Sequence, residues 1–365
     1  MNIIVFFLVL LVLMLVHELG HFIAAKKAGV WVEEFGFGIP PRLFGKKIGD
    51  TVYSINMIPF GAFVRLHGES EGEKIKKSKK AFVSKKPWQK IIIIIAGVIM
   101  NFILAIVCFA VVYSYTGVPR ESENVTVISV FKDSPAEEAG ILPGDVVFTL
   151  DGEKVKSTDS FIRIIDDKKD TEVDLTLLRE DNEYVNTTIT PRGEPPAGEG
   201  PMGVAITSTE IYFPPLWQRP FLGVYHGFKE ALFWGSAIVL GLLDMFRKLF
   251  VGQVPADIAG PVGIYALTSK AASVGILTLV NFVGIFSVNL AILNIIPFPG
   301  LDGGRLMFIG AETVLGKKIL PKTEGYVHAL GLIILIMLLF AITVHDVRRV
   351  LDAGSISGFL DSILR

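Results

Sequence analysis

Apolar runs of membrane length alternate with mixed stretches along this chain of 365 residues. A helix needs about 20 apolar residues to cross the hydrocarbon core of a bilayer, and four runs meet or approach that length. The predicted spans are residues 3–24, 91–114, 275–297 and 326–344. A fifth helical stretch, 221–250, carries scattered charges, and its longest charge-free piece is too short to cross. We therefore expect four spans, with 221–250 lying at the membrane interface or packed against the bundle.

A segment rich in Phe, Ile, Val and Gly follows the first span, at about 30–66. Weak alternation predicts a strand at 51–58, with 61–66 as its partner and Pro59-Phe60-Gly61 as the turn between them. Gly36-Phe37-Gly38 indicates a tight backbone loop. Because bare strand edges cannot face lipid, we expect this β-region to pack against the helices or to line a wet cavity. A small cytoplasmic hairpin is the alternative.

Residues 121–208 have the composition of a globular domain. The expected elements are strands at 125–131, 146–150, 173–179 and 184–190, and helices at 135–139 and 158–167. Ser134 is placed to cap a short helix with Pro135 at its first position, and Gly140 to end it. This pattern predicts an α+β domain inserted between the second and third spans.

The predicted fold is therefore an α-helical polytopic membrane protein with about four spans, a membrane-associated β-region and an inserted extracytoplasmic α+β domain. Its parts are a first half of the membrane core at 1–117, the inserted domain at 121–208, a Pro-rich linker and helix at 214–250, and a second half of the core at 255–365.

Composition narrows the class of protein. The chain is 51% hydrophobic with a mean hydropathy of +0.54, which is too apolar for an ordinary soluble protein. A formal net charge of −1 gives no reason to expect a nucleic-acid partner. Cys108 is the only cysteine, so an intramolecular disulfide and a thiolate metal site are both excluded. The first run lacks a basic start and a small-residue cleavage site, so we retain it as a membrane helix.

Lysines are concentrated at 69–90, between the first two spans. Such an excess beside spans marks the cytoplasmic side. The N-terminus and the inserted domain are then expected outside the cytoplasm, and the end of the first span in the cytoplasmic half of the membrane. If 221–250 does not span, the 275–297 helix runs inward and delivers the residues after it to the same depth.

Candidate chemistry lies at the end of the first span, at His17-Glu18-Leu19-Gly20-His21. Histidines four residues apart share one helix face and can bind one metal ion, and the Glu beside the first can act as general base on a metal-bound water. Ionisable groups in a membrane helix are costly and usually functional. The alternative is a helix end with a chance His-Glu pair.

A catalytic zinc site keeps three protein ligands and one open position. Asp302 is our candidate for the third ligand, because it is the only carboxylate in an apolar neighbourhood where Pro297 and Pro299 break the helix. Asn289 and Asn294 lie on the helix that enters this turn, and an amide there could bind substrate backbone or steady an oxyanion. Hydrogen bonding between helices is an equally good account of both asparagines.

These residues carry a resemblance to the site-2 proteases, intramembrane zinc metalloproteases of bacterial inner membranes. The shared features are the His17–His21 motif, the run Asn294 to Gly304, the segment Gly260 to Ile264, and one domain inserted between the core spans. The resemblance implies one zinc ion held by His17, His21 and Asp302, with Glu18 as the catalytic base. It also implies that an extended substrate pairs with the β-region, here about 51–66.

The inserted domain resembles a PDZ domain through Ser134 to Val147 and the Asp151-Gly152 pair. PDZ domains bind an extended peptide along a sheet edge. In PDZ domains of bacterial membrane proteases the binding loop and strand come last in the chain, and Gly200 to Ile206 fits that place. The candidate loop residues are Gly200, Met202, Gly203 and Val204. A purely structural domain is the alternative.

The leading hypothesis is an endopeptidase that cuts single-span membrane proteins in regulated intramembrane proteolysis, after a first cut by another protease. The resemblance implies substrates such as anti-sigma factors or signal-peptide remnants, with the lipid bilayer as the surrounding medium. A non-catalytic membrane scaffold, in which zinc only ties helices together, is the alternative from another class. A zinc-dependent amidase or signal-peptide hydrolase would differ only in substrate.

Overall fold

The computed structural model describes residues 2–69, 75–179, 183–252, 259–316, 321–355 and 358–360. Residues 70–74 of the predicted basic loop and 180–182 of the predicted inserted domain lie outside the described residues. So do 255–258, 317–320, 356–357 and 361–365 of the predicted second half of the core. The chain forms two compact units. One comprises Met1–Tyr115 and Pro220–Arg365, and the other is Thr116–Arg219.

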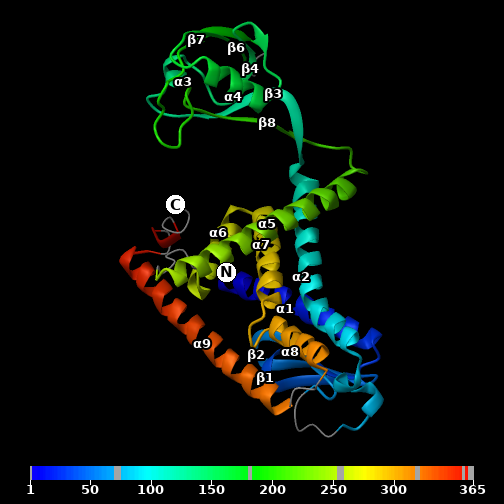
Figure 1. The fold of residues 1–365 in the computed structure, drawn as a ribbon. Helices are drawn as coiled ribbons and strands as arrows, with labels where there is room; N and C mark the ends of the chain where they lie inside the picture. Colours follow the sequence, from blue (N-terminus) through cyan, green and yellow to red (C-terminus); the bar gives the residue numbers. More distant parts are fainter. Residues whose placement is uncertain are drawn as a thin grey trace. The chain divides into compact units, whose positions relative to one another are not determined.

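The first unit is a helical bundle with a small sheet (Figure 1). Its helices are α1 (Asn2–Lys27), α2 (Pro87–Thr116), α5 (Arg219–Phe250), α6 (Pro261–Val274), α7 (Ile276–Ile295), α8 (Asp302–Leu315) and α9 (Pro321–Asp352). Short 3-10 helices η1 (Ser78–Lys80) and η2 (Phe82–Ser84) precede α2. Three of these helices begin at a proline. Proline suits the first position of a helix, because the N–H group that it lacks would have no hydrogen-bond partner within the helix there.

Four helices in the described part of the chain are long and apolar enough to cross a membrane. They are Ile3–Lys27, Pro87–Thr116, Ile276–Ile295 and Thr323–Asp352. The prediction of four apolar spans is confirmed, with each helix somewhat displaced from the predicted bounds. Helix α5 is not one of the four.

Glycines let the helices approach closely. A Cβ atom on Gly20 of α1 would lie 2.2 Å from the carbonyl oxygen of Ala96 on α2. A Cβ atom on Gly227 of α5 would lie 2.7 Å from the carbonyl oxygen of Ile106, also on α2. Backbone contact of this kind is typical of helix association in membranes. Lipid gives the helices no hydrophobic driving force to associate, so small residues that allow close van der Waals packing are favoured where helices meet.

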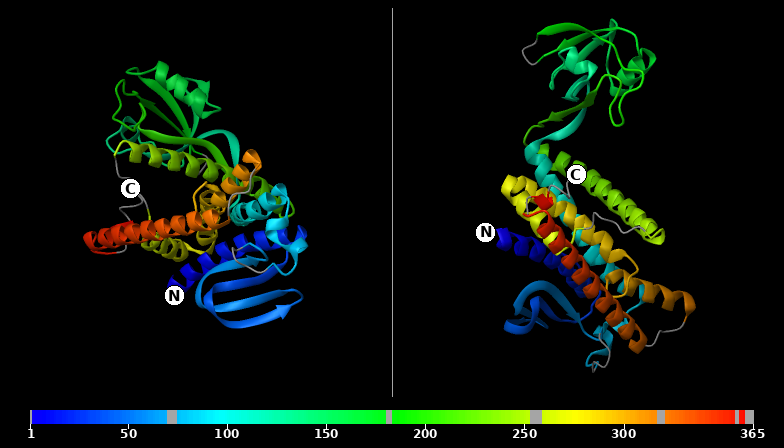
Figure 2. Two further views of the ribbon diagram at one scale, coloured as in Figure 1. Left: turned by 60° about the horizontal axis from the view of Figure 1, so that its bottom comes forward. Right: turned by 90° about the vertical axis from the view of Figure 1, so that its left-hand side faces the viewer.

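The sheet of the first unit consists of β1 (Val32–Ile48) and β2 (Thr51–Leu66). Residues 42–48 of β1 pair with 51–56 of β2. Residues 34–37 of β1 pair with 52–55 on one side and with 62–65 on the other, so they lie between these two stretches of β2. Figure 2 (left) shows the resulting single layer of strands. In the described structure, 62–66 therefore has a sheet neighbour on one side only.

Two sequence predictions are wrong here. Residues 51–58 and 61–66 do not pair with each other, because β1 passes between them. Gly36 lies inside β1 and not in a loop; its missing side chain makes room for Phe63, whose ring a Cβ at Gly36 would meet at 2.3 Å. The glycine that suggested a turn thus allows a close cross-strand contact.

The inserted unit is an antiparallel sheet with two helices. Its elements are β3 (Val118–Val130), α3 (Pro135–Glu138), β4 (Val146–Leu150), β5 (Glu153–Lys154), α4 (Thr158–Asp167), β6 (Val173–Leu178), β7 (Tyr184–Ile189) and β8 (Val204–Tyr212). The strand order is β7-β6-β4-β3-β8, with β5 paired to β4. The Ser134 side chain caps α3 by accepting a hydrogen bond from the Glu137 backbone. Strand β8 ends this order and, among the described strands, pairs only with β3.

Leu150 lies in the middle of the core of the inserted unit and is fully buried. Replacing it with alanine removes buried apolar groups and leaves a cavity. We expect Leu150→Ala to destabilise this unit by about 2–5 kcal/mol. Limited proteolysis of the full-length protein against urea measures the loss; protection equal to that of the wild type would contradict it.

Candidate metal centre

His17 and His21 occupy one face of α1, one turn apart, and their rings converge. Their Nε2 atoms lie 3.1 Å from each other. The histidines, together with Glu18, form a group of potential metal ligands whose atoms all lie within 4.8 Å of one another. The i, i+4 spacing accounts for this convergence without any tertiary contact.

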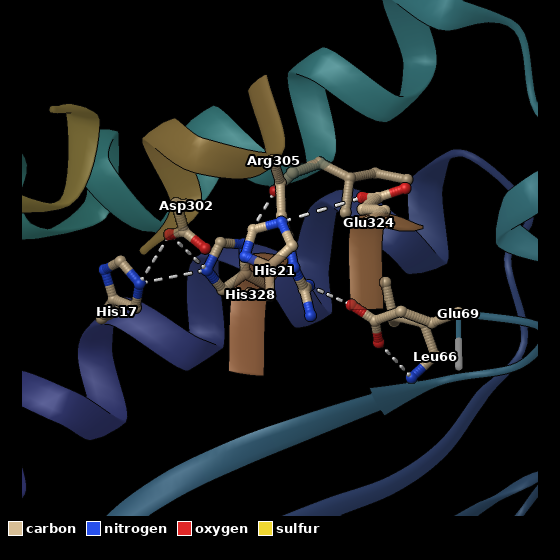
Figure 3. Close-up of polar contacts among 9 residues, drawn as sticks. His17, His21, Leu66, Glu69, Asp302, Arg305, Glu324 and His328 are labelled. Atoms are coloured by element: carbon tan, nitrogen blue, oxygen red, sulfur yellow. Dashed lines mark hydrogen bonds and ion pairs between the residues drawn. The ribbon is translucent and has the colours of Figure 1, made fainter. Parts of the chain in front are cut away.

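Asp302 comes to the same point from the other half of the chain (Figure 3). Its Oδ2 atom lies 3.0 Å from His17 Nε2 and 3.2 Å from His21 Nε2. Helix α7 ends at Ile295, and α8 begins at Asp302 itself, with Leu301 as its N-cap residue. The aspartate is therefore held in the first turn of a helix, not in a loose loop.

The backbone around Asp302 is tightly folded. A Cβ atom on Gly303 would lie 2.1 Å from the carbonyl oxygen of Ile296, and one on Gly304 would lie 2.5 Å from that of Phe298. These positions accept only glycine without displacing the turn. The turn between α7 and α8 thus fixes the depth and direction of the Asp302 carboxylate.

The donor set fits a zinc ion. Tetrahedral zinc places its ligand atoms about 3.3–3.5 Å apart, close to the 3.0, 3.1 and 3.2 Å separations among these three atoms. Asp302 Oδ2 is buried and has no hydrogen-bond donor in the described structure. An orphaned carboxylate oxygen facing two imidazole nitrogens is the environment that a cation satisfies.

A polar group of α2 lies on the far side of each ring. His21 Nδ1 lies 2.8 Å from the Ile93 carbonyl oxygen, so Nδ1 carries the proton and Nε2 keeps its lone pair for a metal. Asn101 Nδ2 lies 3.5 Å from His17 Nδ1, and the buried Asn101 Oδ1 has no hydrogen-bond partner among the described residues. Turned so that this oxygen faces His17, the amide selects the same tautomer there.

A cavity of about 410 Å³ opens beside Glu18, His21 and Asp302. It is lined by Glu18 and His21 from α1, by the edge of β2, by the turn before α8 and by α9. Phe63, Val64 and Leu66 of β2 form its strand wall. A carboxylate beside a metal-bound water, in a cavity with an extended backbone wall, can run acid–base chemistry on a peptide bond.

Further charged groups at this cavity were not found from the sequence. Glu69 forms an ion pair with Arg305, and its other carboxylate oxygen accepts a hydrogen bond from the Leu66 backbone at 3.3 Å. The Glu69 carboxylate raises the pKa of Arg305 above its usual value, against the opposing effect of burial. The sequence holds one hint, since Arg305 directly follows the Asp302-Gly303-Gly304 run.

His328 also has a role that the sequence did not reveal. Its Nδ1 accepts a hydrogen bond of 2.9 Å from the Gly300 backbone. Gly331 packs against the same turn, because a Cβ atom there would lie 2.1 Å from the Pro299 carbonyl oxygen. Helix α9 therefore braces the turn that carries Asp302.

The remaining predicted site residues lie elsewhere. Asn289 and Asn294 are half-buried on α7, and neither lines the cavity beside Glu18; their role with substrate stays a prediction. In the inserted unit, Gly203 adopts a φ of +72° directly before Val204 opens β8. The Met202 side chain is buried in the core of this unit, at 2% exposure.

Backbone contacts tie the rest of this loop to its own unit. The carbonyl oxygens of Met202 and Gly203 accept hydrogen bonds from Ala136 at 3.0 Å and Phe131 at 2.9 Å. The Gly200 carbonyl oxygen accepts a hydrogen bond from the Gly203 backbone at 3.0 Å. The peptide-binding role of these loop residues stays a prediction.

An HExxH-type helix in an apolar bundle, with a carboxylate delivered from a second membrane segment, defines a membrane metalloprotease. The chain belongs to Peptidase family M50, whose model matches residues 5–338. The protein is accordingly a zinc metalloprotease, and the predicted site-2 protease family and zinc cofactor are confirmed.

Relatives named as zinc metalloproteases align with nearly the whole chain. A putative zinc metalloprotease of Clostridium perfringens (strain 13 / Type A) is 35% identical over 338 residues, covering 92% of this chain and 95% of that protein. Regulator of sigma-W protease RasP of Bacillus subtilis (strain 168) is 28% identical over 428 residues, covering 95% of this chain and 98% of that protein.

Among solved structures, the PDZ domain of an SdrC-like protein from Listeria monocytogenes is 26% identical. The match covers 23% of this chain and 87% of the chain in that structure, with a TM-score of 0.21.

Proposed function

We propose that this protein is an intramembrane zinc endopeptidase that cuts membrane-spanning substrates within or near the bilayer. The observation that carries the proposal is the convergence of His17, His21 and Asp302 beside Glu18, at a cavity between apolar helices. His17, His21 and Asp302 would hold the ion. Bound zinc supplies an activated water and polarises the scissile carbonyl.

Glu18 is the proton carrier in this proposal. Its carboxylate accepts the proton of the attacking water and later delivers it to the leaving amine. Ile93 and Asn101 hold the two imidazoles from behind, so that neither ring turns as charge moves through the site. The surrounding apolar side chains exclude bulk water and strengthen each of these electrostatic interactions.

The strand edge at 62–66 is the proposed substrate-binding element. A transmembrane helix hides its carbonyl groups in internal hydrogen bonds, so a substrate must unwind before cleavage. Residues 62–66 have an unpaired side in the described sheet and line the cavity. An opened substrate segment can add to this edge as a further strand, which places its backbone beside the metal.

The proposed topology follows the lysine-rich loop. With 69–90 in the cytoplasm, the N-terminus and the inserted domain are extracytoplasmic, and the zinc site lies in the cytoplasmic half of a multi-pass cell-membrane protein. Helix α5 then lies beside the bundle without crossing, and α7 runs inward. The contact of Asp302 with His17 and His21 supports this arrangement, because the C-terminal part of α1 and the start of α8 then lie at the same depth in the membrane.

We further propose that the inserted domain is a PDZ domain that excludes bulky ectodomains or binds a freshly cut C-terminus along β8. The terminal position of β8 in the sheet supports an added strand. Substrates would be single-span proteins such as anti-sigma factors or signal-peptide remnants, already cut once by another protease. The sigma-W regulator among the relatives supports this substrate class.

Metal removal tests the proposal. Purified protein in liposomes should cleave a co-reconstituted single-span substrate, and a chelator should remove both the zinc and the cleavage, because the proposed mechanism uses a zinc-activated water. Stoichiometric zinc should restore turnover, read as product bands over time. Cleavage that survives complete zinc removal would contradict the proposal, and zinc binding without cleavage would favour the scaffold.

A further inference from the structure

One carboxylate joins the wall of the cavity to the helix that carries Asp302. Glu69 Oε1 pairs with Arg305, and Glu69 Oε2 accepts the Leu66 N–H at 3.3 Å. Figure 3 shows Glu69 between these two partners, with Asp302 on the same helix as Arg305. The Glu69 side chain is 15% exposed, whereas the Arg305 side chain is 44% exposed.

The two partners of Glu69 stand at functionally different places. Leu66 is the last residue of β2 and ends the 62–66 edge. Arg305 lies three residues after Asp302 in the first turn of α8, so the two side chains share one helix face. The Glu69–Arg305 pair therefore joins the end of this edge to the helix that begins at Asp302.

Alignment between a bound peptide and the metal depends on the distance between these two elements. A strand added to the 62–66 edge takes its position from the edge backbone, whereas the metal takes its position in part from Asp302. A misplacement of about 1 Å between reacting groups can cost about 100-fold in rate. Elements β2 and α8 are separated by more than 200 residues of chain, so tertiary contacts must set this distance.

We propose that Glu69 is a positioning residue that holds the 62–66 edge in register with Asp302 through Arg305. The inference rests on the proposed function, since it assumes that substrate pairs with this edge. Glu69 is not one of the three proposed metal ligands; it acts on the strand through Leu66 and on Asp302 through α8. Substrate binding and metal retention are thereby linked to one ion pair.

Glu69→Gln is the sharpest variant. The amide oxygen still accepts the Leu66 N–H, so the edge persists and KM for a single-span substrate should change by less than about threefold. The ion pair is lost, so kcat at saturating zinc should fall by about 10–100-fold. Zinc release into excess chelator, measured without substrate, should accelerate by about 10-fold or more, as expected for a residue that orients a ligand.

Two companion variants test the link itself. Arg305→Gln should reproduce both effects, and the double variant should be no worse than the more affected single one, because both changes remove the same pair. If the losses of the two single variants multiply in the double variant, the proposal is overturned. Arg305→Lys keeps the charge and should keep zinc release within about threefold of the wild type; release as fast as in Arg305→Gln would overturn the proposal.

Glu33→Gln is the matched control. The Glu33 carboxylate pairs at 2.6 Å with the buried His67, which lies two residues before Glu69 in the chain. Glu33 itself does not line the cavity. Its kcat and zinc release should match those of the wild type. Equal losses in Glu33→Gln and Glu69→Gln would mean general loosening of this segment and would overturn the assignment.

Failure of the inference differs from failure of the proposed function. If the wild type cleaves and Glu69→Gln equals it in kcat and zinc release, the inference falls and the endopeptidase stands. If the wild type binds zinc and cleaves no membrane substrate, the proposed function falls, and unchanged zinc release in Glu69→Gln then overturns the inference separately.

Discussion

Glu18→Gln should reduce turnover of a membrane substrate by about 10²–10⁴-fold, which is the usual contribution of general acid–base catalysis. The amide has the size of the carboxylate but cannot take a proton from water or return one to the leaving amine. Zinc should remain at one ion per chain, because His17, His21 and Asp302 are unchanged. Metal analysis and single-turnover cleavage in liposomes measure the two quantities on the same preparation.

Glu230→Gln controls for the loss of a shielded carboxylate elsewhere in the bundle. Glu230 on α5 accepts hydrogen bonds of 2.9 Å from both Tyr113 and Trp234 and does not line the cavity. Its turnover should stay within about threefold of the wild type. Undiminished cleavage by Glu18→Gln would remove Glu18 from the mechanism, and zinc loss in that variant would reassign it as a ligand.

Local patterns predicted the parts of this molecule that depend on local geometry. The four apolar helices follow from run length alone. The convergence of His17 and His21 follows from the helical repeat, since residues four apart share a face. In the inserted unit, Ser134 caps its helix as its position before Pro135 indicated.

Contacts between distant segments were beyond local patterns. The pairing of 34–37 with two stretches of β2 depends on register, which alternation alone does not specify. Gly36 was misassigned to a loop because a glycine in sequence looks the same whether it opens a turn or admits an aromatic ring. Asp302 could be predicted from the sequence only because carboxylates are scarce in its neighbourhood. Glu69 lies in a charged segment, where nothing in the sequence distinguishes it from the other charged residues.

Gly97 is a further residue whose importance exists only in the folded bundle. It lies on α2 and backs directly onto the face of α1 that carries His17 and His21. A Cβ atom at Gly97 would lie 2.5 Å from His21 Nε2 and 2.7 Å from His17 Cε1. Both rings are also held from behind by hydrogen bonds, so neither can turn away without losing one.

Gly97→Ala should therefore abolish stoichiometric zinc binding and reduce cleavage by more than about 100-fold, in line with the loss of a metal-bound water, while the helices persist. Alanine favours a helix over glycine by about 1 kcal/mol, so loss of α2 itself is not the expected cause. Gly310→Ala on α8 is the control, because no neighbouring heavy atom lies within 4 Å of its added Cβ. Zinc content and cleavage in Gly310→Ala should equal those of the wild type. A Gly97→Ala protein that binds zinc normally would show that α1 and α2 separate easily, and the close crossing would not then define the metal site.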